Sequence, residues 1–509
     1  MTDYSENTRR IAKNTLMLYF RMFFLMILGL FTSRVVLEAL GESDFGIYSV
    51  VGGVVGMFTL ISGALASSIG RFISFELGKK GSGRIREVYS TAVIVQILIS
   101  LIIVLVAEPS GIWFIDNKMN IDPDMIPAAR WVLHFSIASF VVNLISVPQM
   151  SAITAHEKLS AYAFVGIIDG LLRLGSALMI SVAAIDARLV LYAALMLLTV
   201  LVVRVCYVIF CRYKIPACRF AFVYDKTLLK EMFSFAGWEF IGISAGVLRD
   251  QGGTILVNIF FGTVMNAARG IAVQLSNTVQ GFVTNFMTAV NPQITKSYAA
   301  GEYQYTFSLV RKASRMSFYL LFIFALPLLF NTDFLMKLWL KEVPADAVIF
   351  VRLFLVFSLS ESLARPLITA LLARGDIRNY QIIVGGLQLL TIPVSYVLFK
   401  SGFPAETSVA VSIVISMICL LARLLIMKHQ MNFPVRDFFS RVIMNVIYVT
   451  ASALVIPMLA CRYIPDTSLG QASEIAIAFL SAGIAVFLVG FSATERREVL
   501  SFIFKRFRR

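Results

Sequence analysis

The sequence predicts an all-α polytopic membrane protein with about 14 transmembrane helices, and three observations support this fold class. Of the 509 residues, 58% are hydrophobic and only 15% are charged, and the mean hydropathy is +0.82. Soluble domains carry more charge on their surface. Apolar runs of about 18 residues or more, long enough to cross a hydrocarbon core as a helix, recur from end to end. Such runs exclude an outer-membrane barrel, whose strands alternate apolar and polar residues.

Breaks between the apolar runs locate the spans along the chain. The first follows the start MTDYSENTRRIAKN and lacks a small-residue cleavage site, so we expect a retained helix rather than a signal peptide. In chain order the spans are expected at residues 14–38, 45–69, 88–107, 129–150, 160–183, 189–210, 233–260, 265–290, 313–330, 347–372, 380–399, 406–427, 442–461 and 473–491.

The distribution of basic residues supports this number of spans and indicates their orientation. With the amino terminus in the cytoplasm, roughly 31 basic residues fall on that side and roughly six on the other. The cytoplasmic set includes Arg365 and Arg423. This asymmetry accounts for the formal charge of +15 without a nucleic-acid partner. The loops are too short for a catalytic domain, so we do not expect an enzyme.

A faint internal repeat divides the predicted bundle. An alignment places Gly41 opposite Gly262 when the segment LGESDFGIYSVVGG is matched with FGTVMNAARGIAVQ. Chance similarity between two apolar stretches is the alternative explanation. An even number of spans separates the copies, so a true repeat would be parallel, related by an axis along the membrane normal. The predicted organisation is two pseudo-symmetric six-helix lobes with two extra helices and a basic cytoplasmic tail. Their bounds are residues 1–215, 216–430 and 431–509.

The seventh predicted span carries the first candidate site residues. At helical spacing, Glu239, Arg249 and Asp250 share an arc of roughly 100° with several glycines, and the opposite side is apolar. A charge within the bilayer costs roughly 2.5 to 3.5 kcal/mol, so each needs a partner or a water-filled cavity. Because Arg249 and Asp250 are adjacent, we expect no direct pair between them. The neighbouring glycines are expected to leave room for a ligand.

The eighth predicted span carries a polar stripe. Its members lie on one face at helical spacing: Asn266, Arg269, Gly270, Asn277, Gln280, Gly281, Thr284, Thr288 and Asn291. Helix packing could account for such a stripe, but so many amides would be costly if they were dry. Cavity lining is therefore the favoured interpretation.

Further charges also lie within predicted spans: Arg21, Arg34 and Glu38, Asp169 and Arg173, and Glu361 and Arg365. Asp169 and Arg173 have i,i+4 spacing near the bilayer centre, which suits a structural ion pair as well as a site. Arg34 and Glu38 are expected to form an interfacial pair. Glu361 and Arg365 are expected to extend to the cytoplasm.

These residue types favour an anionic ligand with many hydroxyls. Guanidinium groups bind phosphate through paired N–H donors, and amides both donate hydrogen bonds to sugar hydroxyls and accept hydrogen bonds from them. The sequence has no Walker A loop, and its five cysteines lack metal-ligand spacing, so no cofactor is expected. Transport would then depend on an ion gradient or on the gradient of the substrate. A buried carboxylate such as Asp250 could bind Na⁺ or a proton.

Four motifs carry a resemblance to a known family: TSRVVLEALGESDFGIYSVVGG, VLRDQGGTILVNIFFG, NAARGIAVQLSNTVQGF and NPQITKSYAAGE. Together they resemble the polysaccharide-transporter branch of the multidrug/oligosaccharidyl-lipid/polysaccharide flippase superfamily. The chain is similar to bacterial Wzx-type O-antigen and capsule flippases and, more distantly, to the peptidoglycan lipid II flippase.

The resemblance implies a V-shaped pair of six-helix lobes that works by alternating access in the bacterial inner membrane, with both termini in the cytoplasm. It would transfer an undecaprenyl-diphosphate-linked oligosaccharide, for O-antigen, capsule or exopolysaccharide, from the cytoplasmic to the periplasmic leaflet. In the lipid II relative, arginines of the first and eighth helices line a cationic cavity. Arg269 matches the eighth-helix position, and Arg21 and Arg34 match the first helix loosely. The second-helix arginine of that relative has no counterpart here.

The site hypothesis combines these residues. The candidate substrate-binding residues are Arg249, Arg269, Arg21, Arg173, Arg34, Asn277 and Gln280, and the candidate ion-coupling residues are Asp250, Glu239 and Asp169. The expected partners are the lipid-linked oligosaccharide, membrane lipids, and the polymerase and glycosyltransferases of the same pathway. The alternative is a cation-coupled multidrug exporter of the same fold, whose cleft should be acidic and aromatic. An O-antigen polymerase or ligase would need a large periplasmic loop, which the sequence lacks.

Overall fold

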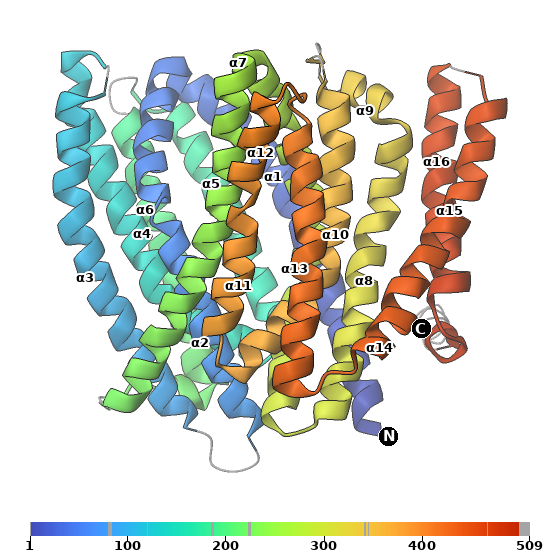
Figure 1. Cartoon of the computed structure of the whole chain (residues 1–509). Coiled ribbons are helices and arrows are strands. Elements are labelled where there is room, and N and C mark those ends of the chain that lie inside the picture. Colours follow the sequence, from blue (N-terminus) through green and yellow to red (C-terminus); the bar gives the residue numbers. More distant parts are fainter. Residues whose placement is uncertain are drawn as a thin grey trace, which may run out of the picture. The chain divides into compact units, whose positions relative to one another are not determined.

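The structure is a computed structural model that describes residues 2–79, 84–119, 121–184, 188–221, 225–340, 343–344, 346–465 and 467–497. Over these residues the chain is helical without any strand, which confirms the predicted all-α fold class (Figure 1). Thirteen helices within this described part are long and apolar enough to cross a membrane. Most of the predicted basic tail, residues 498–509, lies outside the described residues.

The chain divides into two compact units, which we describe separately. Unit 1 comprises Met1–Phe240 and Thr288–Gly301, and unit 2 comprises Ile241–Met287 and Glu302–Arg509. The helices of unit 1 are α1 (Thr2–Gly56), α2 (Thr59–Gly78), α3 (Ile85–Asn117), α4 (Ile126–Ala155), α5 (Leu159–Ser181) and α6 (Arg188–Lys214), with both ends of α7 (Lys226–Ala299). Unit 2 contains the rest of α7 and α8 (Tyr303–Phe330), α9 (Thr332–Trp339), α10 (Ala347–Arg374), α11 (Arg378–Leu389), α12 (Thr391–Lys400), α13 (Thr407–Met431), α14 (Val435–Phe438), α15 (Met444–Tyr463) and α16 (Ser468–Ala485).

Two of these helices are interrupted by glycine. Gly41 in α1 and Gly262 in α7 have φ of 76° and 81°, a region that side chains disfavour. A straight helix of 74 residues would extend about 111 Å, far beyond a bilayer of about 30 Å. The break at Gly262 therefore separates two crossings, as predicted for the seventh and eighth spans. The two glycines aligned by the predicted repeat thus share one backbone conformation.

The start of α7 is fixed by a capping carboxylate. Asp225 accepts hydrogen bonds from the backbone N–H groups of Leu228 at 3.1 Å and Thr227 at 2.9 Å. Its carboxylate also lies 3.3 Å from the Arg84 guanidinium. The backbone bond from Leu228 is the main reason that the pKa of Asp225 is lowered. Satisfied N–H groups and a preceding non-helical residue explain why the helix begins here.

Unit 1 has a buried carboxylate where α4 ends. The Glu157 side chain is only 3% exposed and lies 2.6 Å from both Arg10 and Lys296. Gln293 donates a further hydrogen bond to it at 2.7 Å. Glu157 also has a φ of 58°, which is uncommon outside glycine. The three partners hold it in that conformation, and they join the start of α1, the α4–α5 turn and the end of α7.

We expect Glu157→Gln to destabilise the protein. The change would leave two cations without their buried counter-charge, and loss of one partner from a buried pair costs about 3–5 kcal/mol. Since Arg10 is half exposed, we discount this to roughly 2 kcal/mol. The measurement is the melting temperature in detergent, with the exposed Asp124→Asn as a control in the same unit. Equal melting temperatures for the two variants would show that the cluster does not stabilise unit 1.

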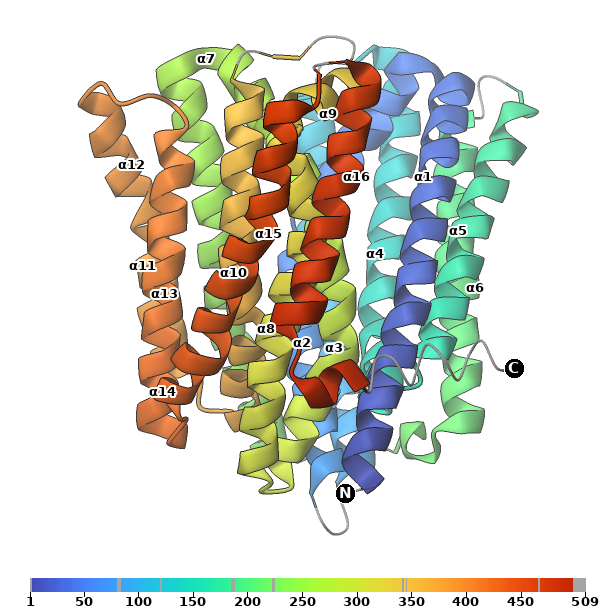
Figure 2. The same ribbon diagram turned by 90° about the vertical axis from the view of Figure 1, so that its right-hand side faces the viewer.

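In unit 2, α10 is the central helix. It packs against α8 and α13, and most of its residues are buried. The last two long helices, α15 and α16, lie side by side (Figures 1 and 2). Of these, α16 makes the main contact with α8.

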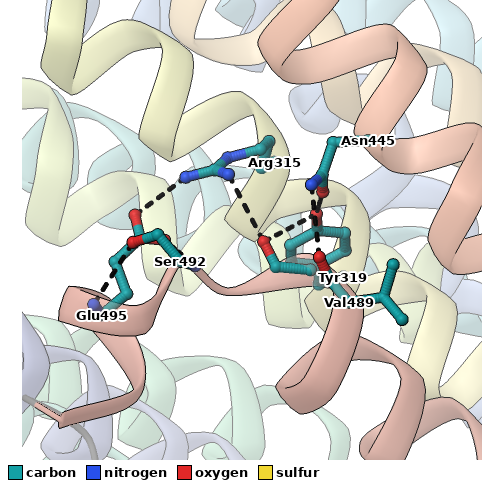
Figure 3. A network of polar contacts seen from close by, with 7 residues as sticks. Arg315, Tyr319, Asn445, Val489, Ser492 and Glu495 are labelled. Carbon is teal, nitrogen blue, oxygen red and sulfur yellow. Dashed lines mark hydrogen bonds and ion pairs between the residues drawn. The ribbon is translucent and has the colours of Figure 1, made fainter.

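A polar network fastens this helical pair to α8 (Figure 3). Arg315 of α8 donates to Glu495 at 2.8 Å and to the carbonyl of Gly490 at 3.3 Å. Tyr319, one turn further along α8, hydrogen-bonds Asn445 of α15. Ser492 and Glu495 bond each other's backbone N–H groups, which is the reciprocal pattern of a capping box.

Two π-helical segments flank this network. They are η4 (Phe439–Ile443), which precedes α15, and η5 (Val486–Gly490), which follows α16. A Cβ at Gly490 would lie about 3.0 Å from the Tyr319 ring, so the close approach there requires glycine. Polar contacts near the middle of α8 thus help to attach the last helices, together with the packing of α16 against α8.

Candidate functional site

The two residues that first suggested a site form a direct pair. Arg249 Nε donates to Asp250 Oδ1 at 2.8 Å, so the expectation that adjacent residues would not pair is wrong. The arginine side chain is long enough to fold back along the helix surface to its neighbour. The Arg249 side chain is 11% exposed, whereas the Asp250 side chain is 60% exposed. The guanidinium also lies over the ring of Phe357 in α10, 4.9 Å from its centroid.

Arg269 lies against the same stretch of α10. It is 5% exposed, and its guanidinium lies 5.0 Å from the centroid of the Phe354 ring. Its Nη2 donates to the backbone carbonyl of Asp250 and its Nε to Thr254 Oγ1, both at 3.4 Å. Cation–π contacts of this kind contribute about 0.5–2 kcal/mol each. The structure therefore brings the two principal candidate arginines onto neighbouring phenylalanines of one helix.

The glycines that share the polar face of α7 with Arg249 and Asp250 lie against protein side chains. A Cβ at Gly253 would lie 2.8 Å from Arg269 Nη2, and one at Gly242 would overlap the Gln381 amide of α11. A Cβ at Gly246 would lie 3.7 Å from Gln388, also of α11. The expectation that these glycines leave room for a ligand is wrong, because small residues let neighbouring groups approach closely.

The polar stripe of the eighth span is split between two environments. Gln280 donates to Ser358 of α10 at 2.9 Å and accepts from Arg365 at 3.1 Å. Asn277 and Thr284 are exposed. One edge of the stripe therefore packs against α10, and the side chains of the other edge are exposed in the middle of a span.

Glu361 and Arg365 were expected to extend to the cytoplasm, but their side chains bond to neighbouring helices instead. Arg365 bonds Gln280, and Glu361 accepts from Ser416 of α13 at 2.7 Å. Arg423, expected in a cytoplasmic segment, is instead 1% exposed. Its position inside the expected span 406–427 is the signal that could have identified it as buried. The error comes from grouping it with Lys428 at the end of that span.

The candidate residues of unit 1 are more dispersed. Arg173 pairs with Asp169 at 3.0 Å and Arg34 with Glu38 at 2.9 Å, which confirms both i,i+4 pairs, and the second pair is exposed. The two other residues occupy separate settings: the Arg21 guanidinium lies 4.4 Å from the centroid of the Tyr162 ring, and Glu239 accepts from Ser67 at 3.1 Å. Arg21, Arg34, Arg173 and Glu239 thus each have their own partners.

Unit 1 contains a cavity of about 220 Å³. Its polar lining consists of Arg173, Tyr48, Asn143, Ser136 and Ser139, and its apolar and glycine lining of Gly52, Val55, Gly56, Phe140, Ala193, Met196 and Val200. Sites for drug-sized ligands are usually about 300–1,000 Å³, so this cavity suits a small polar group or water. Over the described residues there is no group of three or more His, Cys, Asp or Glu side chains that could hold a metal.

We expect Gly253→Ala to displace the Arg269 guanidinium from Phe354, because the added methyl group would occupy its place. Overpacking of this kind costs about 1–3 kcal/mol, so the melting temperature in detergent should fall. Gly270→Ala is the matched control on the same helix, since a Cβ there meets no atom within 4 Å. If the Gly253→Ala variant melted at or above the temperature of the control, the close contact between Gly253 and the Arg269 guanidinium would be disproved.

Comparison with known proteins identifies the fold. No family model and no curated protein matches the chain. A multidrug resistance MATE family transporter of the MOP superfamily, in an outward-facing conformation, matches with a TM-score of 0.67 and 11% identity, covering 82% of this chain and 94% of that one. A point mutant of the Vibrio cholerae MATE transporter VcmN gives 0.67 and 15%, covering 85% and 100%. The MATE transporter ClbM in complex with Rb⁺ gives 0.67 and 13%, covering 81% and 94%. At these identities the likeness shows the fold alone, an all-α helical membrane fold shared with these proteins.

Proposed function

We propose that this chain is a flippase for an anionic lipid-linked oligosaccharide. The observation that carries the proposal is the pair of arginines, Arg249 and Arg269, held against Phe357 and Phe354 inside the membrane-spanning part of unit 2. Guanidinium groups in a low-dielectric setting attract phosphate strongly and can bind it through two N–H donors at once. The oxygen atoms of a diphosphate linkage would accept hydrogen bonds from these N–H donors.

The exposed amides of α7 support the same proposal. Gln274 and Asn277 are exposed in the middle of a span, where contact with lipid would leave their amide groups unsatisfied. Sugar hydroxyls or water would satisfy them. In the proposed cycle the lipid-linked oligosaccharide passes from the cytoplasmic to the periplasmic leaflet of a bacterial inner membrane by alternating access, and both termini stay in the cytoplasm. A polymerase and glycosyltransferases of the same pathway would be its partners.

Asp250 is the favoured residue for coupling to an ion. Its carboxylate holds Arg249 and is largely exposed, whereas Asp169 and Glu239 are engaged with Arg173 and Ser67. A phosphate that binds Arg249 would compete with Asp250, and the released carboxylate could then take up Na⁺ or a proton. Binding of substrate and of the cation would in this way favour each other.

The first test is substitution of the two arginines. We expect Arg249→Ala and Arg269→Ala each to lower flipping at least about tenfold, because a charged hydrogen bond contributes about 1.5–3 kcal/mol. Arg249→Lys should be intermediate, since it keeps the charge and loses the paired donors. Flipping is measured as exposure of lipid-linked oligosaccharide on the outer leaflet, at matched protein levels, with the exposed Arg462→Ala as the control. Normal exposure of the oligosaccharide in both alanine variants would refute the proposed site.

A second candidate is a cation-coupled multidrug exporter, and the comparisons favour it. The similar solved structures include a multidrug resistance transporter and a MATE transporter in complex with Rb⁺. In this case the exposed Asp250 carboxylate would bind the cation, and the arginines would repel cationic drugs.

The two candidates predict opposite effects in a drug-efflux assay. For an exporter of lipophilic cations, Asp250→Asn should abolish efflux, whereas Arg249→Ala should preserve or increase it because a repelling charge is removed. For the flippase, deletion of the gene should leave drug sensitivity unchanged. Drug hypersensitivity of the deletion strain together with normal surface polysaccharide would replace the first proposal with the second.

A further inference from the structure

A second cluster of buried and half-buried polar side chains lies beside the proposed flipping site in unit 2. It lies between α10, α11 and α13, and its members are Glu361, Arg365, Tyr380, Ser416 and Arg423. Of the side chains that are almost fully buried, Arg423 is among the largest. At 1% exposure it is more deeply buried than Arg269, which is 5% exposed.

The donors of Arg423 are incompletely satisfied. Tyr380 hydrogen-bonds the guanidinium, but Nε and Nη1 have no hydrogen-bond partner among the described residues. A guanidinium carries five N–H donors and always keeps its charge. A buried charged donor without an acceptor is costly, so these nitrogens point to a group that the protein itself does not supply.

The nearby carboxylate does not neutralise Arg423 directly. Glu361 accepts from Ser416 at 2.7 Å, and among the described residues it forms no ion pair within 4.0 Å. The neighbouring arginines have other acceptors, since Arg249 bonds Asp250 and Arg365 bonds Gln280. Three guanidinium groups therefore act on one half-buried carboxylate, and the excess charge is positive.

We propose that the unpartnered side of Arg423 binds a small monovalent anion of the halide class. An anion there would accept from Nε and Nη1 and would reduce the excess positive charge of the cluster. The adjoining residues of α13 are closely packed, with Cys419 at 0% and Leu424 at 1% exposure, which favours a monatomic ion over phosphate or sulfate. The bound anion would be a resident part of unit 2, distinct from the transported substrate.

The test uses the full chain purified in detergent. Crystals grown in bromide should show anomalous bromine scattering in contact with the Arg423 guanidinium. The melting temperature should rise with chloride or bromide relative to gluconate at equal ionic strength. Arg423→Gln should lose at least half of that rise, and the exposed Arg462→Gln should keep all of it.

Further variants separate this inference from the proposed function. Arg269→Ala should keep the halide response even where flipping is lost, because Arg269 is not one of the three guanidinium groups around Glu361. If Arg423→Gln fails to fold, Arg423→Lys serves instead and should bind bromide more weakly, while the crystal experiment needs only the unaltered chain. Absence of a bromine signal at Arg423, or equal melting in halide and gluconate, would overturn the proposal. A bromine signal confined to Arg249 and Arg269 would overturn it as well.

Discussion

The organisation of unit 2 depends on how guanidinium groups are accommodated inside an apolar helix bundle. In this unit α10 supplies most of the contacts that stabilise the guanidinium groups. Its phenylalanines, Phe354 and Phe357, cover Arg269 and Arg249, and its Ser358 fixes the amide that accepts from Arg365. Aromatic faces and short hydroxyls satisfy positive charge without bringing in water. The helix α10 is central because it forms the apolar core of unit 2 and also contacts the arginine side chains.

The arrangement of the spans could be predicted from the sequence because each depends on one segment only. Hydrophobic length and the breaks between apolar runs located the helices, and two of these breaks fall where Gly41 and Gly262 interrupt α1 and α7. The pairs Arg34–Glu38 and Asp169–Arg173 were predictable for the same reason, since i,i+4 residues on one helix always face each other.

Contacts between helices could not be predicted in this way. The direction of the Arg249 side chain depends on its rotamer and on Phe357, which lies about a hundred residues away in the chain. The burial of Arg423 was missed because the residue was grouped with Lys428 at the end of its span, and it is the packing of α10 and α11 against α13 that buries it. The glycines beside Arg249 and Asp250 were expected to leave room for a ligand, but the sequence could not show that Arg269 and side chains of α11 approach them instead.

Stability alone does not account for the charges in unit 2. Replacing buried ion pairs by apolar residues of similar volume is often neutral or stabilising by about 1–4 kcal/mol, so a bundle with leucine at these positions could fold as well. The excess also has one sign: four arginines lie in or beside the cluster, against Glu361 and the exposed Asp250. A structural network would tend to balance its charges, because each unbalanced one adds its own desolvation cost. A positive excess held within the membrane-spanning part is instead what the proposed transport of an anionic substrate would require.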